Sequence, residues 1–176
     1  MQKRLTRGYV QVYTGNGKGK STAAFGLAVR AAGAGLRVFI AQFLKSGQYS
    51  EIRGLKALRG RVTVRQFGSG HFVKGKPAAS DFRVAAKGVE AVRNVLLGHR
   101  ADVVILDEIN VAVRAGVVPL RAIWGLLAIR PPDVEIVLTG RNADRRIIER
   151  ADLVTEMREI KHYYRAGIKA RRGIEM

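Results

Sequence analysis

A glycine-rich run between a strand-like segment and a helix-forming segment constrains this chain more than any other feature. Residues 9–13 before the run favour a short strand, and residues 20–34 favour a helix. The run itself is Thr14, Gly15, Asn16, Gly17, Lys18, Gly19, Lys20, Ser21 and Thr22. Glycines let the backbone curl so that successive N–H groups face phosphate oxygens, and a helix N-terminus adds the positive end of its dipole. This order of strand, loop and helix predicts a phosphate-binding loop.

The residue types in this loop suggest separate roles. We expect Lys20 to neutralise terminal phosphates, Ser21 to ligate Mg²⁺ (or Mn²⁺), and Lys18 to add a second cation. The spacing departs from the usual G-x-x-x-x-G-K-[ST] pattern, because Thr14 occupies the first glycine position and counting from Gly15 leaves the loop one residue short. A flexible turn of Gly and Lys is the alternative interpretation.

Strand-like and helix-like runs alternate along the rest of the chain. Further strands are expected at 38–43, 62–67, 103–106, 134–138 and 152–158. Further helices are expected at 50–59, at 80–98, from Pro119 onward and near 143–150. This alternation predicts an α/β fold: a single domain with a mostly parallel sheet of about six strands and helices on both faces, P-loop NTPase-like and RecA-like. Ligands of such sheets bind at the carboxyl ends of the strands.

Two carboxylates, Asp107 and Glu108, directly follow the apolar run at 103–106. Such a run is typical of a parallel strand buried on both faces. In phosphate-loop proteins, acids at this place hold Mg²⁺ or its water shell, while acids of an ordinary strand-end turn are the alternative. Arg141, just after the 134–138 strand, is placed to reach a phosphate, with a surface Arg on a turn as its alternative.

The 176 residues include 32 Lys and Arg against 14 Asp and Glu, a net charge of +18. Such an excess favours an anionic partner: nucleic acid, an anionic membrane or a phosphate-rich small molecule. Because 47% of the residues are hydrophobic, the chain is not a disordered basic tail. The absence of Cys excludes disulfides, thiolate metal sites and cysteine catalysis. With no targeting or membrane-spanning segment visible, we expect a cytoplasmic protein without a membrane partner.

Four segments of the chain read T-G-N-G-K-G-K-S-T, V-V-I-L-D-E-I-N, L-T-G-R and K-H-Y-Y-R-A-G-I-K-A-R-R-G-I-E. Together they resemble the ATP:corrinoid adenosyltransferases, in particular the phosphate-loop type that acts on cob(I)alamin or cob(I)yrinic acid a,c-diamide. The shortened loop is typical of that family, and the last segment is the most specific. The resemblance runs from Gly8 to Glu175, so residues 8–176 are expected to form the domain and residues 1–7 a short basic extension.

This resemblance implies a reaction of adenosylcobalamin biosynthesis or salvage. A corrinoid, reduced from Co(II) to Co(I) by an electron donor, attacks C5′ of ATP; the 5′-deoxyadenosyl group moves to cobalt and triphosphate leaves. Lys20, Glu108 and Arg141 are the implied catalytic residues, because Lys20 and Arg141 would stabilise this leaving group directly and Glu108 would do so through Mg²⁺. Mg²⁺ would lie on Ser21, Asp107 and Glu108. The rest of the ATP cradle would be Thr14, Gly15, Asn16, Gly17, Lys18, Gly19 and Thr22. A homodimer is also implied.

One segment departs from the family pattern. Bacterial members often carry G-x-G-F-x-W after the third strand, where the aromatic residues are implicated in displacing the lower axial ligand of cobalt. Residues 67–74 of this chain contain Phe72, which matches the Phe, but no Trp. Phe72 and His71 are therefore the candidate corrinoid contacts, with a loop His of no such role as the alternative for His71. Trp124, on the apolar face of a helix, is expected in the core.

Two other functions compete with this one. A nucleic-acid-stimulated P-loop ATPase would use the net charge and the basic C-terminal segment. However, 176 residues leave little room for a nucleic-acid domain, and only 7% of the residues are aromatic and able to stack on bases. A nucleic-acid partner is therefore not expected. A nucleoside or small-molecule kinase would need an acceptor base and a lid, and neither is identifiable in the sequence.

Overall fold

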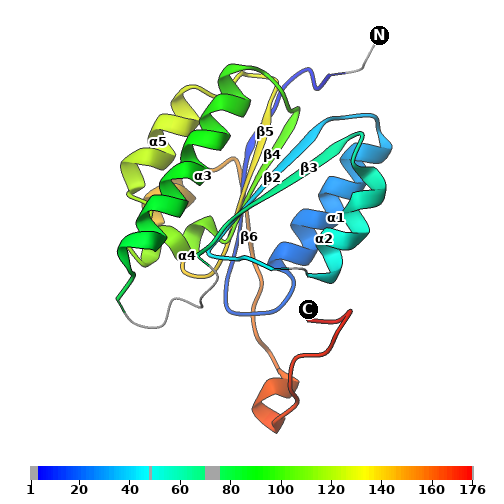
Figure 1. Ribbon diagram of the computed structural model, residues 1–176, viewed down its shortest axis with the longest axis vertical. Coiled ribbons are helices and arrows are strands. Elements are labelled where there is room, and N and C mark those ends of the chain that lie inside the picture. The colour runs from blue at the N-terminus through cyan, green and yellow to red at the C-terminus, as the bar shows by residue number, and fades with distance from the viewer. Residues whose placement is uncertain (1–3, 48, 70–75, 176) are drawn as a thin grey trace.

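The computed structural model describes residues 4–47, 49–69 and 76–175. These residues form a six-stranded sheet in the order β3-β2-β4-β5-β1-β6, in which every pairing is parallel (Figure 1). The strands are β1 Val10–Thr14, β2 Val38–Phe43, β3 Val62–Phe67, β4 Val103–Asp107, β5 Glu135–Thr139 and β6 Leu153–Glu156. The phosphate-loop strand β1 and the acidic strand β4 are not neighbours, because β5 lies between them.

Helices cover both faces of this sheet (Figure 1). On one face lie α1 (Lys20–Gly33) and α2 (Ser50–Leu55). On the other face lie α3 (Ala79–Leu97), α4 (Ile109–Arg114) and α5 (Leu120–Ala128). The remaining helical segments are α6 (Arg145–Arg150) and the 3₁₀ turns η1 (Lys56–Leu58) and η2 (Tyr163–Ala166). Crossovers of this kind return the chain to the same end of the sheet, so successive strands run parallel.

Strand β4 shows how the apolar pattern builds two cores. All of its residues are buried. Val104 and Leu106 belong to the core with α3 and α5, whereas Val103 and Ile105 belong to the core with α1 and α2. Successive residues of a strand face opposite sides of a sheet, so a strand covered on both sides needs an uninterrupted apolar run.

The pairing register brings the carboxyl ends of several strands together at one end of the sheet. Tyr13 of β1 pairs with Thr139 of β5, and Gln42 of β2 pairs with Asp107 of β4. The loops after these strands therefore lie close together. They contain the glycine-rich run, the acidic pair and the turn with Arg141, which is why residues far apart in the sequence meet.

The α/β class, the mainly parallel sheet and the helices on both faces are confirmed. The differences lie at element ends. The expected helix at 50–59 is α2 followed by a 3₁₀ turn, and the expected strand at 152–158 is only Leu153–Glu156. Strand β6 is the outermost strand of the sheet and all four of its residues are exposed, so few packing contacts favour a longer strand. Among the residues described, no helix has the length and apolar character needed to cross a membrane.

Candidate active site

The phosphate loop connects β1 to α1 and packs against the chain that follows β6. The Gly17 N–H donates to the Met157 carbonyl at 2.7 Å. A Cβ at Gly15 would lie 2.4 Å from the same carbonyl oxygen, and Gly15 has a φ of 94°, which favours glycine. A Cβ at Gly17 would lie 2.7 Å from the Arg158 carbonyl oxygen. The glycines are therefore required for the close approach of two backbone segments.

Lys20, the first residue of α1, lies in the curl of this loop. Its Nζ donates to the carbonyl oxygens of Gly15 and Gly17 at 2.7 Å each. The residue is only 8% exposed. Burial, together with the positive charge of Arg141, lowers the pKa of Lys20. The loop thus holds an ammonium group in surroundings that an incoming anion would make more favourable.

Asp107 ends β4 and is fully buried. Its carboxylate accepts hydrogen bonds from Thr139 Oγ1 at 2.7 Å, Gln42 Nε2 at 3.0 Å and Lys45 Nζ at 3.0 Å. Burial by itself would raise the pKa of Asp107, but the charge of Lys45 and these hydrogen bonds hold that pKa below its ordinary value. Asp107 is therefore a charged carboxylate in the protein interior.

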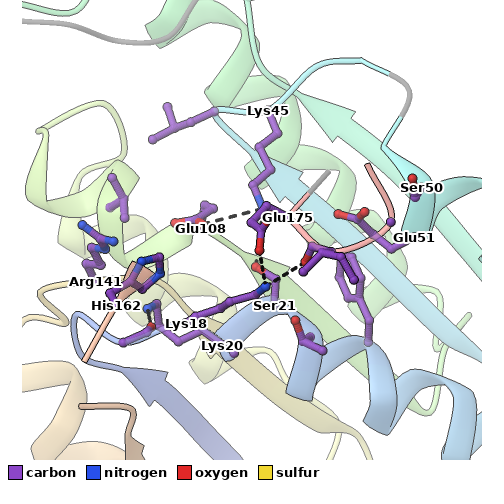
Figure 2. A pocket seen from close by; sticks show the side chains of 18 of the residues that line it. Lys18, Lys20, Ser21, Lys45, Ser50, Glu51, Glu108, Arg141, His162 and Glu175 are labelled. Atoms are coloured by element: carbon purple, nitrogen blue, oxygen red, sulfur yellow. Dashed lines mark hydrogen bonds and ion pairs between the residues drawn. The ribbon is translucent and has the colours of Figure 1, made fainter. Parts of the chain in front are cut away.

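Glu108 follows in a left-handed backbone conformation with a φ of 59°. This conformation costs a residue other than glycine about 1 kcal/mol or more. It is held by the Glu108 N–H, which donates to Thr139 Oγ1 at 3.0 Å. The Glu108 side chain lines the cavity described below (Figure 2). The neighbouring Asp107 stays buried. Burial, aided by the charge of Asp107, raises the pKa of Glu108.

Lys45, just beyond β2, is a site residue that the sequence analysis missed. Its Nζ lies 3.0 Å from Asp107 Oδ2, 3.6 Å from Glu108 Oε1 and 3.4 Å from Ser21 Oγ. Burial would lower the pKa of Lys45, but the two carboxylates outweigh burial and raise it. A signal was present in the sequence: Lys45 is the first charged residue after an expected strand, at the sheet edge where ligands bind.

These groups line a cavity of about 1010 Å³ (Figure 2). Its charged and polar lining includes Lys18, Lys20, Ser21, Lys45, Glu108 and Arg141. Its apolar lining includes Phe25, Leu44, Val111, Ala115 and Ile174. A cavity lined by both cations and apolar groups suits a ligand that joins a polyphosphate to a less polar body.

The C-terminal segment closes one side of the cavity. Lys18 Nζ donates to Tyr163 Oη at 3.0 Å, to the Ile174 carbonyl at 2.9 Å and to Glu175 Oε1 at 2.8 Å. Tyr163 Oη also donates to Glu175, and Arg171 donates to the same carboxylate from its backbone and its guanidinium. Hydrogen bonds from Arg171, Lys18 and Tyr163 hold the pKa of Glu175 well below its usual range. The C-terminal segment is thereby tied to the phosphate loop.

Comparison with known proteins leads to the same family as the motifs. The family model described as ATP:corrinoid adenosyltransferase BtuR/CobO/CobP matches residues 6–176. This chain belongs to that family. The corrinoid adenosyltransferase of Pseudomonas aeruginosa is 35% identical to it over 99% of the chain and 86% of the relative. The corrinoid adenosyltransferase of Escherichia coli K12 is 37% identical over 99% of the chain and 88% of the relative. A Sinorhizobium corrinoid adenosyltransferase is 38% identical over 96% and 80%.

The fold of this ATP:corrinoid adenosyltransferase family member brings most of the predicted site residues together. Those that line the cavity are Gly17, Lys18, Gly19, Lys20, Ser21, Thr22, Glu108 and Arg141. Asp107 lies behind them and reaches the site through its contact with Lys45. Three predicted loop residues, Thr14, Gly15 and Asn16, do not line it. Thr14 Oγ1 instead accepts the N–H of Ala143 at 3.2 Å.

The predicted corrinoid contacts His71 and Phe72 lie outside the residues that the structure describes. Trp124 packs against the core of this adenosyltransferase, with the Arg150 guanidinium 4.5 Å from its ring centre. His162 is a further cavity residue that the sequence analysis missed, and it lies beside Arg141 in Figure 2. Only its place in the K-H-Y-Y segment of the family resemblance could have marked it.

Proposed function

We propose that this chain transfers the 5′-deoxyadenosyl group of ATP to the Co(I) of a reduced corrinoid and releases triphosphate, in the biosynthesis or salvage of adenosylcobalamin. The observation that carries this function is the meeting of Lys20, Lys45 and Arg141 in one cavity beside an acidic pair, in a chain of this family. Several cations around a curled, glycine-rich loop suit a triphosphate, which is both a strong polyanion and the leaving group.

The reaction makes an electrostatic demand that these residues meet. An electron pair on cobalt forms the Co–C5′ bond while the C5′–O bond breaks, and the bonding electrons leave with the triphosphate. Negative charge therefore grows on the departing oxygen. Lys20 and Arg141, together with N–H groups of the loop, stabilise that charge from fixed positions. Cobalt is the nucleophile, so the absence of Cys is no obstacle.

We further propose a divalent cation, Mg²⁺ or Mn²⁺, at Ser21, Asp107 and Glu108. Hydroxyl and carboxylate oxygens suit these ions, and Mg²⁺ usually keeps water and substrate phosphates among its ligands. The donor set fits, because Lys45 Nζ already lies near oxygens of all three residues and so a positive charge is accommodated there. The described residues contain no group of three or more His, Cys, Asp or Glu suited to a metal, so phosphate oxygens are needed to complete the coordination. When bound, the ion helps to neutralise the leaving group.

Phe72 and His71 remain the proposed corrinoid contacts. A separate electron donor supplies Co(I), because the reaction begins from a reduced corrinoid. We also propose that residues 8–176 form the catalytic domain after an extension at 1–7, that the protein is a homodimer, and that it works in the cytoplasm, where ATP is available.

Product analysis tests this function. Protein incubated with ATP, Mg²⁺ and chemically reduced cobalamin should form triphosphate and a light-sensitive adenosyl–cobalt product in equal amounts. Lys20→Ala should lower turnover about 100-fold or more, because a fixed charge at the leaving group is lost. Its circular dichroism spectrum should match that of the wild type. ADP as the only nucleotide product would contradict the proposal and favour a kinase. Phosphate release that depends on DNA or RNA would favour an ATPase.

A further inference from the structure

Lys45 joins three elements at the proposed cation site. It follows β2, Ser21 lies in the first turn of α1, and the acidic pair ends β4. Its Nζ is within 3.6 Å of an oxygen from each residue proposed to bind the metal ion. Figure 2 shows the side chain extending among the residues that line the cavity, with a dashed line for its ion pair with Glu108. An ammonium group therefore lies where the divalent cation would have to bind.

Two backbone features fix where the Lys45 side chain starts. Leu44 has a φ of 58°, the left-handed conformation that favours glycine, and this turns the chain sharply after β2. A Cβ at Gly68 would lie 2.6 Å from the backbone N, C and O atoms of Lys45. The backbone at Lys45 is thus clamped against the end of β3, and a strained residue precedes it. Such strain is concentrated at functional positions.

The charge balance around Asp107 explains why the ammonium is there. A fully buried carboxylate is costly unless a cation and hydrogen bonds compensate it. Lys45 supplies the cation at 3.0 Å, whereas the Lys20 ammonium donates to loop carbonyls instead. The Lys45 side chain is still 23% exposed and lines the cavity. It can therefore turn toward a ligand without crossing the protein interior.

We propose that Lys45 is a displaceable counter-ion of the cation site. Without nucleotide, its ammonium neutralises Asp107 and Glu108. When a divalent cation and ATP bind together, the cation takes that place and Lys45 turns to the triphosphate. This inference rests on the proposed metal site. This exchange makes the binding of the cation and of ATP cooperative. A cation alone competes with Lys45, whereas ATP offers the Lys45 ammonium another anionic partner.

Mn²⁺ binding followed by electron paramagnetic resonance tests this role without turnover. In the absence of nucleotide, Lys45→Met should bind Mn²⁺ about tenfold more tightly than the wild type, because the ion no longer competes with a fixed positive charge. The factor by which ATP tightens Mn²⁺ binding should fall about tenfold in the same variant. Lys56→Met is the matched control. It removes an exposed Lys from η1, gives the same net charge and should leave both quantities unchanged.

A second variant, Lys45→Gln, keeps a hydrogen-bond donor near Asp107 and should shift Mn²⁺ affinity in the same direction. Unchanged Mn²⁺ affinity in either folded variant would overturn the inference. Wild-type protein that binds Mn²⁺ equally well with and without ATP would also overturn it, and this measurement needs no variant. The double variant Lys45→Met with Asp107→Asn should lose the tighter Mn²⁺ binding that Lys45→Met gains. If the double variant still binds Mn²⁺ more tightly than the wild type, both the metal site and the role of Lys45 are overturned. Triphosphate formation, measured in parallel on the wild type, reports separately on the proposed function.

Discussion

Lys18 Nζ in the phosphate loop lies 2.8 Å from Glu175 Oε1, near the end of the chain. The contact arises because the chain after β6 runs past the carboxyl ends of the strands and turns back toward α1 (Figure 1). Tyr163 and Arg171 hold the same carboxylate. A negative group beside the proposed triphosphate site therefore already has Lys18 as its partner, and a phosphate ligand must compete with it.

We expect Glu175→Gln to bind ATP about threefold more tightly than the wild type, because a repulsive charge is removed and Lys18 is released. The difference should shrink as salt is raised from low to physiological concentration, since exposed charges are screened. Equilibrium binding of ATP without corrinoid measures both effects.

Glu149→Gln is the control for this change, because it removes an exposed acid of α6 whose ion pair, with Arg145, lies within the same helix. It should leave ATP affinity unchanged. Weaker ATP binding in Glu175→Gln would show instead that the carboxylate holds Lys18 in its productive position.

The two adjacent acids should affect stability with opposite signs. The pKa of Asp107 lies below its ordinary value of 3.8, so the charged form stabilises the fold above that pH, and this contribution is lost as pH falls through the lower folded pKa. Asp107→Asn should therefore cost about 3 kcal/mol at pH 7, since it also leaves Lys45 without its buried partner. Denaturant unfolding should show this cost fading toward acid pH.

Glu108 behaves in the opposite way. The pKa of Glu108 is raised above its ordinary value of 4.5, so the folded protein favours the protonated form of this side chain. The stability that this protonated form contributes is present below pH 4.5 and is lost as pH rises through the folded pKa. Glu108→Gln should therefore raise the free energy of unfolding at pH 7 and have little effect below pH 4.5, while Mn²⁺ binding weakens. Destabilisation at pH 7 by Glu108→Gln would contradict this assignment.

Two glycines within helices should respond to alanine substitution with opposite changes in stability. A Cβ at Gly88 of α3 would lie 2.8 Å from both Phe43 Cε1 and Phe67 Cγ. Gly88→Ala should cost about 1–3 kcal/mol through overpacking, even though Ala favours a helix. A Cβ at Gly26 of α1 would meet nothing within 4 Å, so Gly26→Ala should stabilise the protein by about 0.5–1 kcal/mol. Thermal unfolding distinguishes them, and equal shifts for both variants would disprove the close packing at Gly88.

The fold was largely predictable because its signals are local. The unbroken apolar run at 103–106 predicted a strand covered on both sides, and β4 is buried throughout. The glycine-rich run before residue 20 marked the start of α1 correctly. Strand ends were less predictable, because β6 stops where its single neighbour β1 ends rather than at any residue type. Tertiary pairing decides such boundaries.

Site residues that belong to a local motif were predictable from the sequence. Site residues that are placed by long-range contacts were not. Lys20 and Glu108, which line the cavity, were predicted as site residues from loop spacing and a strand end. Lys45 was not, because its role depends on the left-handed Leu44 and on a partner at position 107 that no local pattern connects to it. Glu175 belonged to a segment recognised by resemblance alone, and only the return of the chain to Lys18 gives it a physical role.

The contact between the phosphate loop and the chain after β6 gives the last prediction. Ala at Gly17 would place its Cβ 2.7 Å from the Arg158 carbonyl oxygen, so the loop must move away, and Lys20 Nζ, which donates to the Gly17 carbonyl, moves with it. We expect Gly17→Ala to weaken ATP binding about tenfold or more, because a small misplacement of a binding group is costly. Gly33→Ala, at the far end of α1 where a Cβ meets nothing within 4 Å, should leave ATP affinity unchanged. Calorimetric titration with ATP measures both variants, and wild-type affinity in Gly17→Ala would show that the loop does not need this close approach.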